Sequence, residues 1–93
     1  MANYILTYDL FGRVPSHGEV QDHIGKAGFQ EYAKILDDGW YIGTPHPLTE
    51  VHEYIMQIFS DNDRIALIEV KAAKLENLEE PVSEILEAFE RHK

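Results

Sequence analysis

One acidic side chain, that of Asp9, occupies a position where an apolar residue would be expected. The segment from Asn3 to Leu10 is rich in β-branched and aromatic residues, which predicts a strand buried on both sides. Side chains on a strand alternate between two faces, so Asp9 continues the face that contains Ile5 and Thr7. A carboxylate at the end of a mostly apolar face either caps the following loop or takes part in chemistry. Asp9 is therefore the first candidate site residue.

Two further groups of acidic residues lie in short polar segments. Asp37 and Asp38 precede a glycine, and Asp61 and Asp63 flank an asparagine. Such patterns are typical of turns, because Asp and Asn side chains bond to nearby backbone amides. We interpret these residues as turn formers in preference to a cation site.

The five histidines do not form a familiar metal-binding pattern. His17 and His23 are six residues apart, as are His46 and His52, whereas ligands on one helix face are usually three or four apart. His17 is instead expected at the edge of the core. The chain has no cysteine, which excludes a disulfide framework, thiolate zinc ligands and a cysteine nucleophile. It also has no glycine-rich phosphate loop and no nucleophile elbow.

Composition narrows the class of protein further. The 93 residues include 17 acidic and 8 basic side chains, and the formal charge is -9 at pH 7. This charge disfavours nucleic acid and anionic membranes as partners. The hydrophobic content of 44% is enough for one core, and the sequence shows no signal peptide or membrane span. We therefore expect one cytoplasmic domain over residues 1–93.

Local signals divide the chain into helices and strands. Ser16 and Glu19 match a capping box, which predicts the start of a helix that closes at Gly28. Strands are predicted over 29–36 and 40–44, joined by a tight Asp-Asp-Gly turn in which the glycine tolerates positive φ angles. A second helix follows, because apolar residues recur there at helical spacing. Its apolar stripe consists of Val51, Tyr54, Ile55, Ile58 and Phe59.

The last predicted strand covers residues 64–70. Its nearly continuous apolar character is typical of a strand in the centre of a sheet. The element order β-α-β-β-α-β predicts an α+β, ferredoxin-like fold over residues 1–70, with two helices on one face of a four-stranded antiparallel sheet. Residues 71–93 are predicted to form a polar connector and an added C-terminal helix. The apolar stripe of that helix consists of Val82, Ile85, Leu86 and Phe89.

Several aromatic side chains allow two interpretations. Aromatic residues on an open sheet can stack on nucleic-acid bases, but the basic residues that usually surround them are missing here. Packing in the core and at a dimer interface is therefore favoured. The residues concerned are Tyr4, Tyr8, Trp40, Tyr41 and Tyr54.

Three segments together resemble the CRISPR-associated ferredoxin-like small nuclease and integration-scaffold superfamily. They are Tyr4–Leu10, Gly39–Thr44 and Ser60–Val70. The resemblance is greatest to the stand-alone SinR-like relatives of that superfamily. It rests on the ordered set of segments, since the Tyr-Asp-Leu sequence alone is too short to be specific.

The resemblance implies a homodimer in which the sheets of two protomers meet. Asp9 matches the aspartate that ends the first strand in the family and lies near its symmetry mate. In the catalytic members these paired aspartates hold a divalent metal for phosphodiester hydrolysis. The resemblance thus implies that Asp9 is a catalytic, metal-binding residue, with Mg or Mn as the ion and RNA or DNA as the substrate. Other members are structural, so it leaves catalytic activity open.

The chain departs from the family in ways that support an alternative. Few basic residues follow Asp9, with only Arg13 before Lys26, and a helix replaces the short strand that many members exchange with their partner. The glutamate-rich tail is also typical of an acidic, non-enzymatic module that binds a basic protein, such as a phage-type inhibitor, a nucleic-acid mimic or an antitoxin. The tail residues are Glu76, Glu79, Glu80, Glu84, Glu87 and Glu90.

Overall fold

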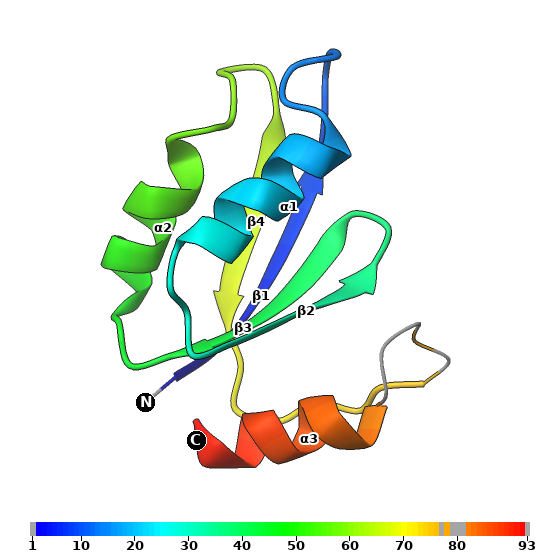
Figure 1. The fold of residues 1–93 in the computed structure, drawn as a ribbon, viewed down its shortest axis with the longest axis vertical. Coiled ribbons are helices and arrows are strands. Elements are labelled where there is room, and N and C mark those ends of the chain that lie inside the picture. Colours follow the sequence, from blue (N-terminus) through cyan, green and yellow to red (C-terminus); the bar gives the residue numbers. More distant parts are fainter. Residues whose placement is uncertain (1, 77, 79–81, 93) are drawn as a thin grey trace.

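The computed structural model describes residues 2–76, 78 and 82–92, and shows an α+β fold with a four-stranded antiparallel sheet and three helices (Figure 1). This arrangement is compatible with the predicted ferredoxin-like fold. The elements are β1 (Ala2–Asp9), α1 (His17–Lys26), β2 (Glu31–Leu36), β3 (Gly39–Thr44), α2 (Leu48–Met56), β4 (Arg64–Glu69) and α3 (Val82–Arg91).

The order of the strands in the sheet is β2-β3-β1-β4, and all neighbouring strands are antiparallel. The prediction that β4 is central was therefore wrong, because β4 forms one edge and the central strands are β1 and β3. The apolar run of β4 does not reflect burial on both faces. Ile65 and Leu67 are half-buried against the core, whereas Ala66 and Ile68 on the other face are exposed.

The main core lies between the sheet and the helices α1 and α2. As predicted, Tyr4, Leu6 and Tyr8 share one face of β1, and all three are buried. They pack against the apolar sides of the two helices, which lie on the same side of the sheet in Figure 1. The buried helical residues are Val20, Ile24, Val51 and Ile55.

The C-terminal helix α3 packs on the opposite face of its own sheet. Phe89 and Ile85 are buried against Tyr41 and Ile35 of the β2–β3 hairpin. Asn3, which also faces this side, donates a hydrogen bond from its side-chain amide to the Phe89 carbonyl at 2.9 Å. α3 covers the β2–β3 half of this face, and Ala66 and Ile68 on β4 stay exposed.

Local signals in the sequence correspond closely to the observed element ends. The capping box is present, because the Ser16 hydroxyl accepts from the Glu19 amide and the Glu19 carboxylate accepts from the Ser16 amide. Gly28 has φ 74° after the end of α1, as expected. The predicted role of Gly39 was wrong. Its φ is not positive, and it begins β3 opposite Leu36, where a Cβ would lie 3.2 Å from the Leu36 Cβ.

Candidate functional site

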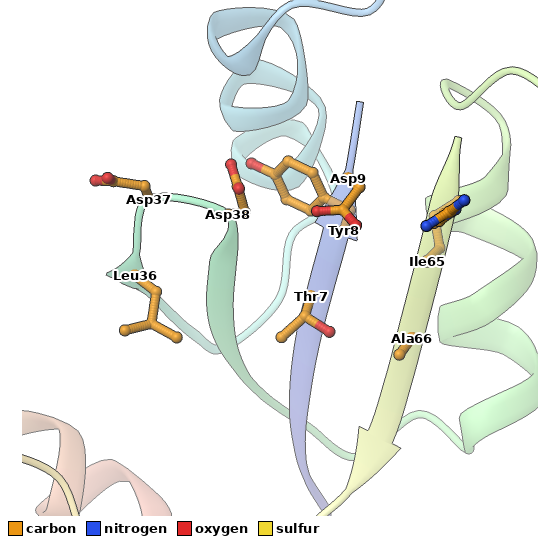
Figure 2. Close-up of a pocket in the computed structure, with 9 residues that line it drawn as sticks. Thr7, Tyr8, Asp9, Leu36, Asp37, Asp38, Ile65 and Ala66 are labelled. Carbon is orange, nitrogen blue, oxygen red and sulfur yellow. The ribbon is translucent and has the colours of Figure 1, made fainter. Parts of the chain in front are cut away.

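Asp9 lies at the exposed C-terminal end of the central strand β1. It lines a cleft of about 620 Å³ between the β2–β3 hairpin and the start of β4. Asp9 and Asp38 both line this cleft, and Figure 2 shows that Asp37 points away from Asp9. The lining residues are Thr7, Tyr8, Asp9, Leu36, Asp37, Asp38, Arg64, Ile65 and Ala66.

A backbone hydrogen bond holds the hairpin beside the end of β1. The Tyr8 amide donates to the Asp38 carbonyl at 3.1 Å, beyond the last paired residues of β1 and β3. Asp37 and Asp38 form the turn, as predicted, and this bond also brings Asp38 into the cleft that contains Asp9. Sequence reasoning missed that second role, because no local signal connects the turn with the end of β1.

Asp38 also lies close to His17 of α1, which is not among the residues that line the cleft. The Asp38 Oδ1 atom lies 3.6 Å from the His17 Nδ1 atom, and the His17 ring centroid lies 6.0 Å from that of Tyr8. His17 thus lies at the edge of the core, as expected, with 59% of its side chain exposed. Burial raises the pKa of the Tyr8 phenol, and the negative charge of Asp38 adds to that rise. Tyr8 is therefore a neutral hydrogen-bonding group near neutral pH.

Arg64 is the basic residue nearest to Asp9 in the sheet. The two residues are paired in the register of β1 and β4, and both are exposed. Their charged atoms are more than 4.0 Å apart, since no ion pair joins them in the described structure. Arg64, which lines the cleft, therefore offers a guanidinium group there, and guanidinium groups bind carboxylate and phosphate oxygens well.

The described residues around Asp9 do not form a complete set of metal ligands. Among the residues that the structure describes, no group of three or more His, Asp or Glu side chains is arranged to hold a metal ion. A hard divalent ion needs six or more oxygen ligands, several of them water in the case of Mg²⁺. A metal site at Asp9 would therefore need water or other ligands in addition to the residues described around it.

Two other residues singled out in the sequence, Asp63 and His23, have structural partners. Asp63 accepts hydrogen bonds from the Phe11 amide at 2.7 Å and the Ser60 amide at 2.8 Å, and these bonds hold the pKa of its carboxyl below the ordinary value. The interpretation of Asp63 as a turn former is confirmed. His23 bonds to the Tyr54 carbonyl at 2.7 Å, and its ring stacks on that of Tyr54 at 4.1 Å.

Packing of the aromatic residues in the core is confirmed. Tyr4, Tyr8, Trp40 and Tyr41 are buried, and Tyr54 is half-buried between α1 and α2. None of them offers an open ring to a base. The exposed aromatic residue on the sheet is Tyr32, which the sequence did not single out and which is 47% exposed.

The acidic tail is described in part. Glu76, Glu84 and Glu87 are exposed, whereas Glu79 and Glu80 lie outside the described residues. Arg91 at the end of α3 donates to the Glu31 carboxylate at 2.6 Å, which ties the helix to β2. The tail thus combines a docked apolar side with exposed carboxylates.

Comparison with family models, with curated proteins and with solved structures yields no match to this chain. Each described helix falls short of the length and apolar character that a membrane-crossing helix needs.

Proposed function

We propose that this protein is a ferredoxin-like homodimer that acts in nucleic-acid processing, as a member of the CRISPR-associated small-nuclease superfamily close to its stand-alone SinR-like relatives. The observation that supports this best is the position of Asp9. It is exposed at the end of a central strand, beside the uncovered part of the sheet and next to the edge strand β4. A partner chain in this region would face Asp9.

The edge of the sheet at β4 supports a second copy as the partner. An edge strand presents unpaired backbone donors and acceptors, and proteins usually protect such edges with charges, proline or a covering segment. The central residues of β4 are apolar, and Ile68 is 52% exposed. Because α3 occupies the β2–β3 half of the open face, a partner would cover the β1–β4 half.

The proposed chemistry needs both protomers. Asp9 from each chain would supply carboxylate oxygens to Mg or Mn, and a divalent ion of this kind polarises a phosphodiester and activates water. Arg64, which pairs with Asp9 in the register, would bind a phosphate oxygen. Two such arginines at the dimer axis would offset part of the repulsion that a chain of formal charge -9 exerts on nucleic acid.

A cleavage assay tests this function. Labelled single-stranded RNA and DNA are incubated with the protein and Mg²⁺ or Mn²⁺, and we expect cleavage that Asp9→Asn abolishes. Asp37→Asn is the matched control, because it removes the same charge from the same cleft at a side chain that points away from Asp9. Cleavage that persists unchanged in Asp9→Asn removes Asp9 from the mechanism. A monomeric mass by light scattering contradicts the shared site.

A second function has its own supporting observation. Glu84 and Glu87 are exposed on α3, on the side away from Ile85 and Phe89, which dock the helix. A docked helix with outward carboxylates can bind a basic protein without any catalysis. The outcome that favours this acidic binding module is a stable protein with no metal-dependent cleavage of either nucleic acid.

A further inference from the structure

A second hollow lies between α1 and the edge strand β2. Its volume is about 640 Å³, similar to that of the Asp9 cleft. Lys34 pairs with Trp40 in the register of β2 and β3, and Trp40 belongs to the core beneath α1 and α2. The hollow is therefore on the helix-covered face of the sheet, whereas Asp9 is on the other face. The two sites are separate.

The hollow gathers positive charge in an acidic protein. Lys26 from α1 and Lys34 from β2 both line it, and they are two of the eight basic residues in a chain of formal charge -9. In the described part of the chain, no carboxylate lies within ion-pair distance of either lysine. Asp22 is the acidic residue among those lining the hollow, so the basic residues are in excess. Two ammonium groups without carboxylate partners are suited to an anion.

An open aromatic ring lies beside these lysines. Tyr32 is 47% exposed, and its ring centroid is 6.5 Å from that of the buried Trp40. The Tyr32 hydroxyl lies beside Gly25 of α1, since a Cβ there would be 3.7 Å from it. Lys26 is also placed to interact favourably with the C-terminus of α1, and a lysine such as Lys34 protects an edge strand. Neither role accounts for an exposed tyrosine that lines the same hollow as the two lysines.

We propose that this hollow binds a nucleotide unit, with its phosphate held by Lys26 and Lys34 and its base stacked on Tyr32. Phosphate contacts from lysine and stacking on an exposed aromatic ring are the two interactions by which proteins hold single-stranded nucleic acid without reading its sequence. The inference uses neither Asp9 nor a metal ion. It therefore holds or fails independently of the proposed nuclease activity.

The single tryptophan of the chain lines the hollow and reports on binding. Trp40 fluorescence and calorimetry are followed while uridine 5′-monophosphate, uridine or inorganic phosphate is added to the metal-free protein. We expect saturable binding of the nucleotide at millimolar concentration or below. The affinity for uridine and for phosphate should each be at least roughly tenfold lower than that for the nucleotide, because each of these ligands lacks one of the two contacts. Added salt should weaken nucleotide binding.

Substitutions of the exposed Tyr32 and the half-buried Lys34, neither of which belongs to the buried core, locate the site. Lys34→Gln and Tyr32→Ala should each weaken nucleotide binding roughly tenfold, whereas Tyr32→Phe should retain it because the ring is kept. Lys71→Gln removes the same charge at an exposed position outside the hollow and should leave binding unchanged. Asp9→Asn should also leave it unchanged, which separates this site from the proposed nuclease site.

Three results would overturn the inference. The first is the lack of any saturable response to the nucleotide at millimolar concentration. The second is equal binding of inorganic phosphate and the nucleotide, which removes the stacked base. The third is a loss of affinity in Lys71→Gln as large as that in Lys34→Gln, which indicates general charge attraction in place of a site.

Discussion

Gly43 of β3 is a position where one added methyl group should disturb the attachment of α3. An ideal Cβ at Gly43 would lie 2.5 Å from the Tyr41 hydroxyl oxygen and 2.7 Å from the His92 Cδ2 atom. Both distances are shorter than a real Cβ contact allows, so Tyr41 and His92 must move in Gly43→Ala. Glycine is required at position 43 because the neighbouring side chains leave no space for a Cβ. A special backbone conformation is not the reason, since the φ angle of Gly43 is not in the positive region.

The movement would break a chain of hydrogen bonds that reaches α3. The Tyr41 hydroxyl donates to the Asn3 side-chain oxygen at 2.6 Å, and the Asn3 amide donates to the Phe89 carbonyl. Burial, together with the nearby charge of Glu31, raises the pKa of Tyr41 to about 12, so the hydroxyl remains a donor at neutral pH. Displacing Tyr41 therefore removes the partner of a buried amide side chain.

The expected loss of stability for Gly43→Ala is about 2 kcal/mol. Overpacking of a filled site costs about 1 to 3 kcal/mol, and the loss of a buried hydrogen bond adds about 1 kcal/mol. Replacing a strand glycine by alanine returns about 0.5 to 1 kcal/mol of backbone entropy. For a domain of this size, the melting temperature should fall by roughly 8 to 16 °C. Urea unfolding followed by circular dichroism measures the change.

Two comparisons show whether the clash causes the loss. Gly25→Ala lies on the exposed side of α1 with its nearest contact at 3.7 Å, so it should stabilise the protein by about 0.5 to 1 kcal/mol. In a Tyr41→Phe background the nearest clashing atom is absent, and Gly43→Ala should cost less than in the unmodified protein. The reasoning is refuted if Gly43→Ala is as stable as the parent chain, or if its cost is the same in both backgrounds.

Two further predictions concern pH and helix capping. Burial lowers the pKa of His92 from its ordinary value of 6.5, so the folded protein binds that proton more weakly than the unfolded chain. The contribution of His92 to the free energy of unfolding is therefore complete above pH 6.5 and is lost as the pH falls below that value. Urea unfolding should show a smaller loss of stability at low pH in His92→Gln than in the parent chain. A pH dependence that is the same in both proteins would contradict this expectation. Ser16→Ala removes the hydroxyl that accepts from the Glu19 amide at 3.2 Å and should cost about 1 kcal/mol, whereas Ser16→Thr should retain most of that stability. Equal unfolding midpoints for the two Ser16 variants would show that the cap is not formed.

Features that depend on neighbouring residues could be predicted from the sequence. The capping box at Ser16 and the left-handed closure at Gly28 were correct, because they depend on a few consecutive residues. The alternation that buries Tyr4 and Leu6 on one face of β1 was also correct, since it follows from strand geometry. Asp9 was recognised as a candidate because this alternation made a carboxylate at that position unexpected.

Features that depend on strand pairing and docking could not be predicted in the same way. The apolar character of β4 indicated a central strand, but the pairing of β1 with β3 left β4 at the edge. Which strands become neighbours depends on the free energy of the whole sheet, to which distant segments contribute. Likewise, the placement of α3 depends on contacts such as that of Phe89 with Tyr41, which no local pattern encodes.

The sequence by itself determined the net negative charge of the chain, the order of its helices and strands, and the residues that could do chemistry. Only the tertiary structure decided which of these residues meet. It placed Asp38 in the cleft of Asp9, and it brought Tyr32, Lys26 and Lys34 together around a second hollow. The physical reason is that a site is formed by residues brought together through antiparallel pairing and helix docking. Local propensities set the elements, but long-range contacts set the distances between their side chains.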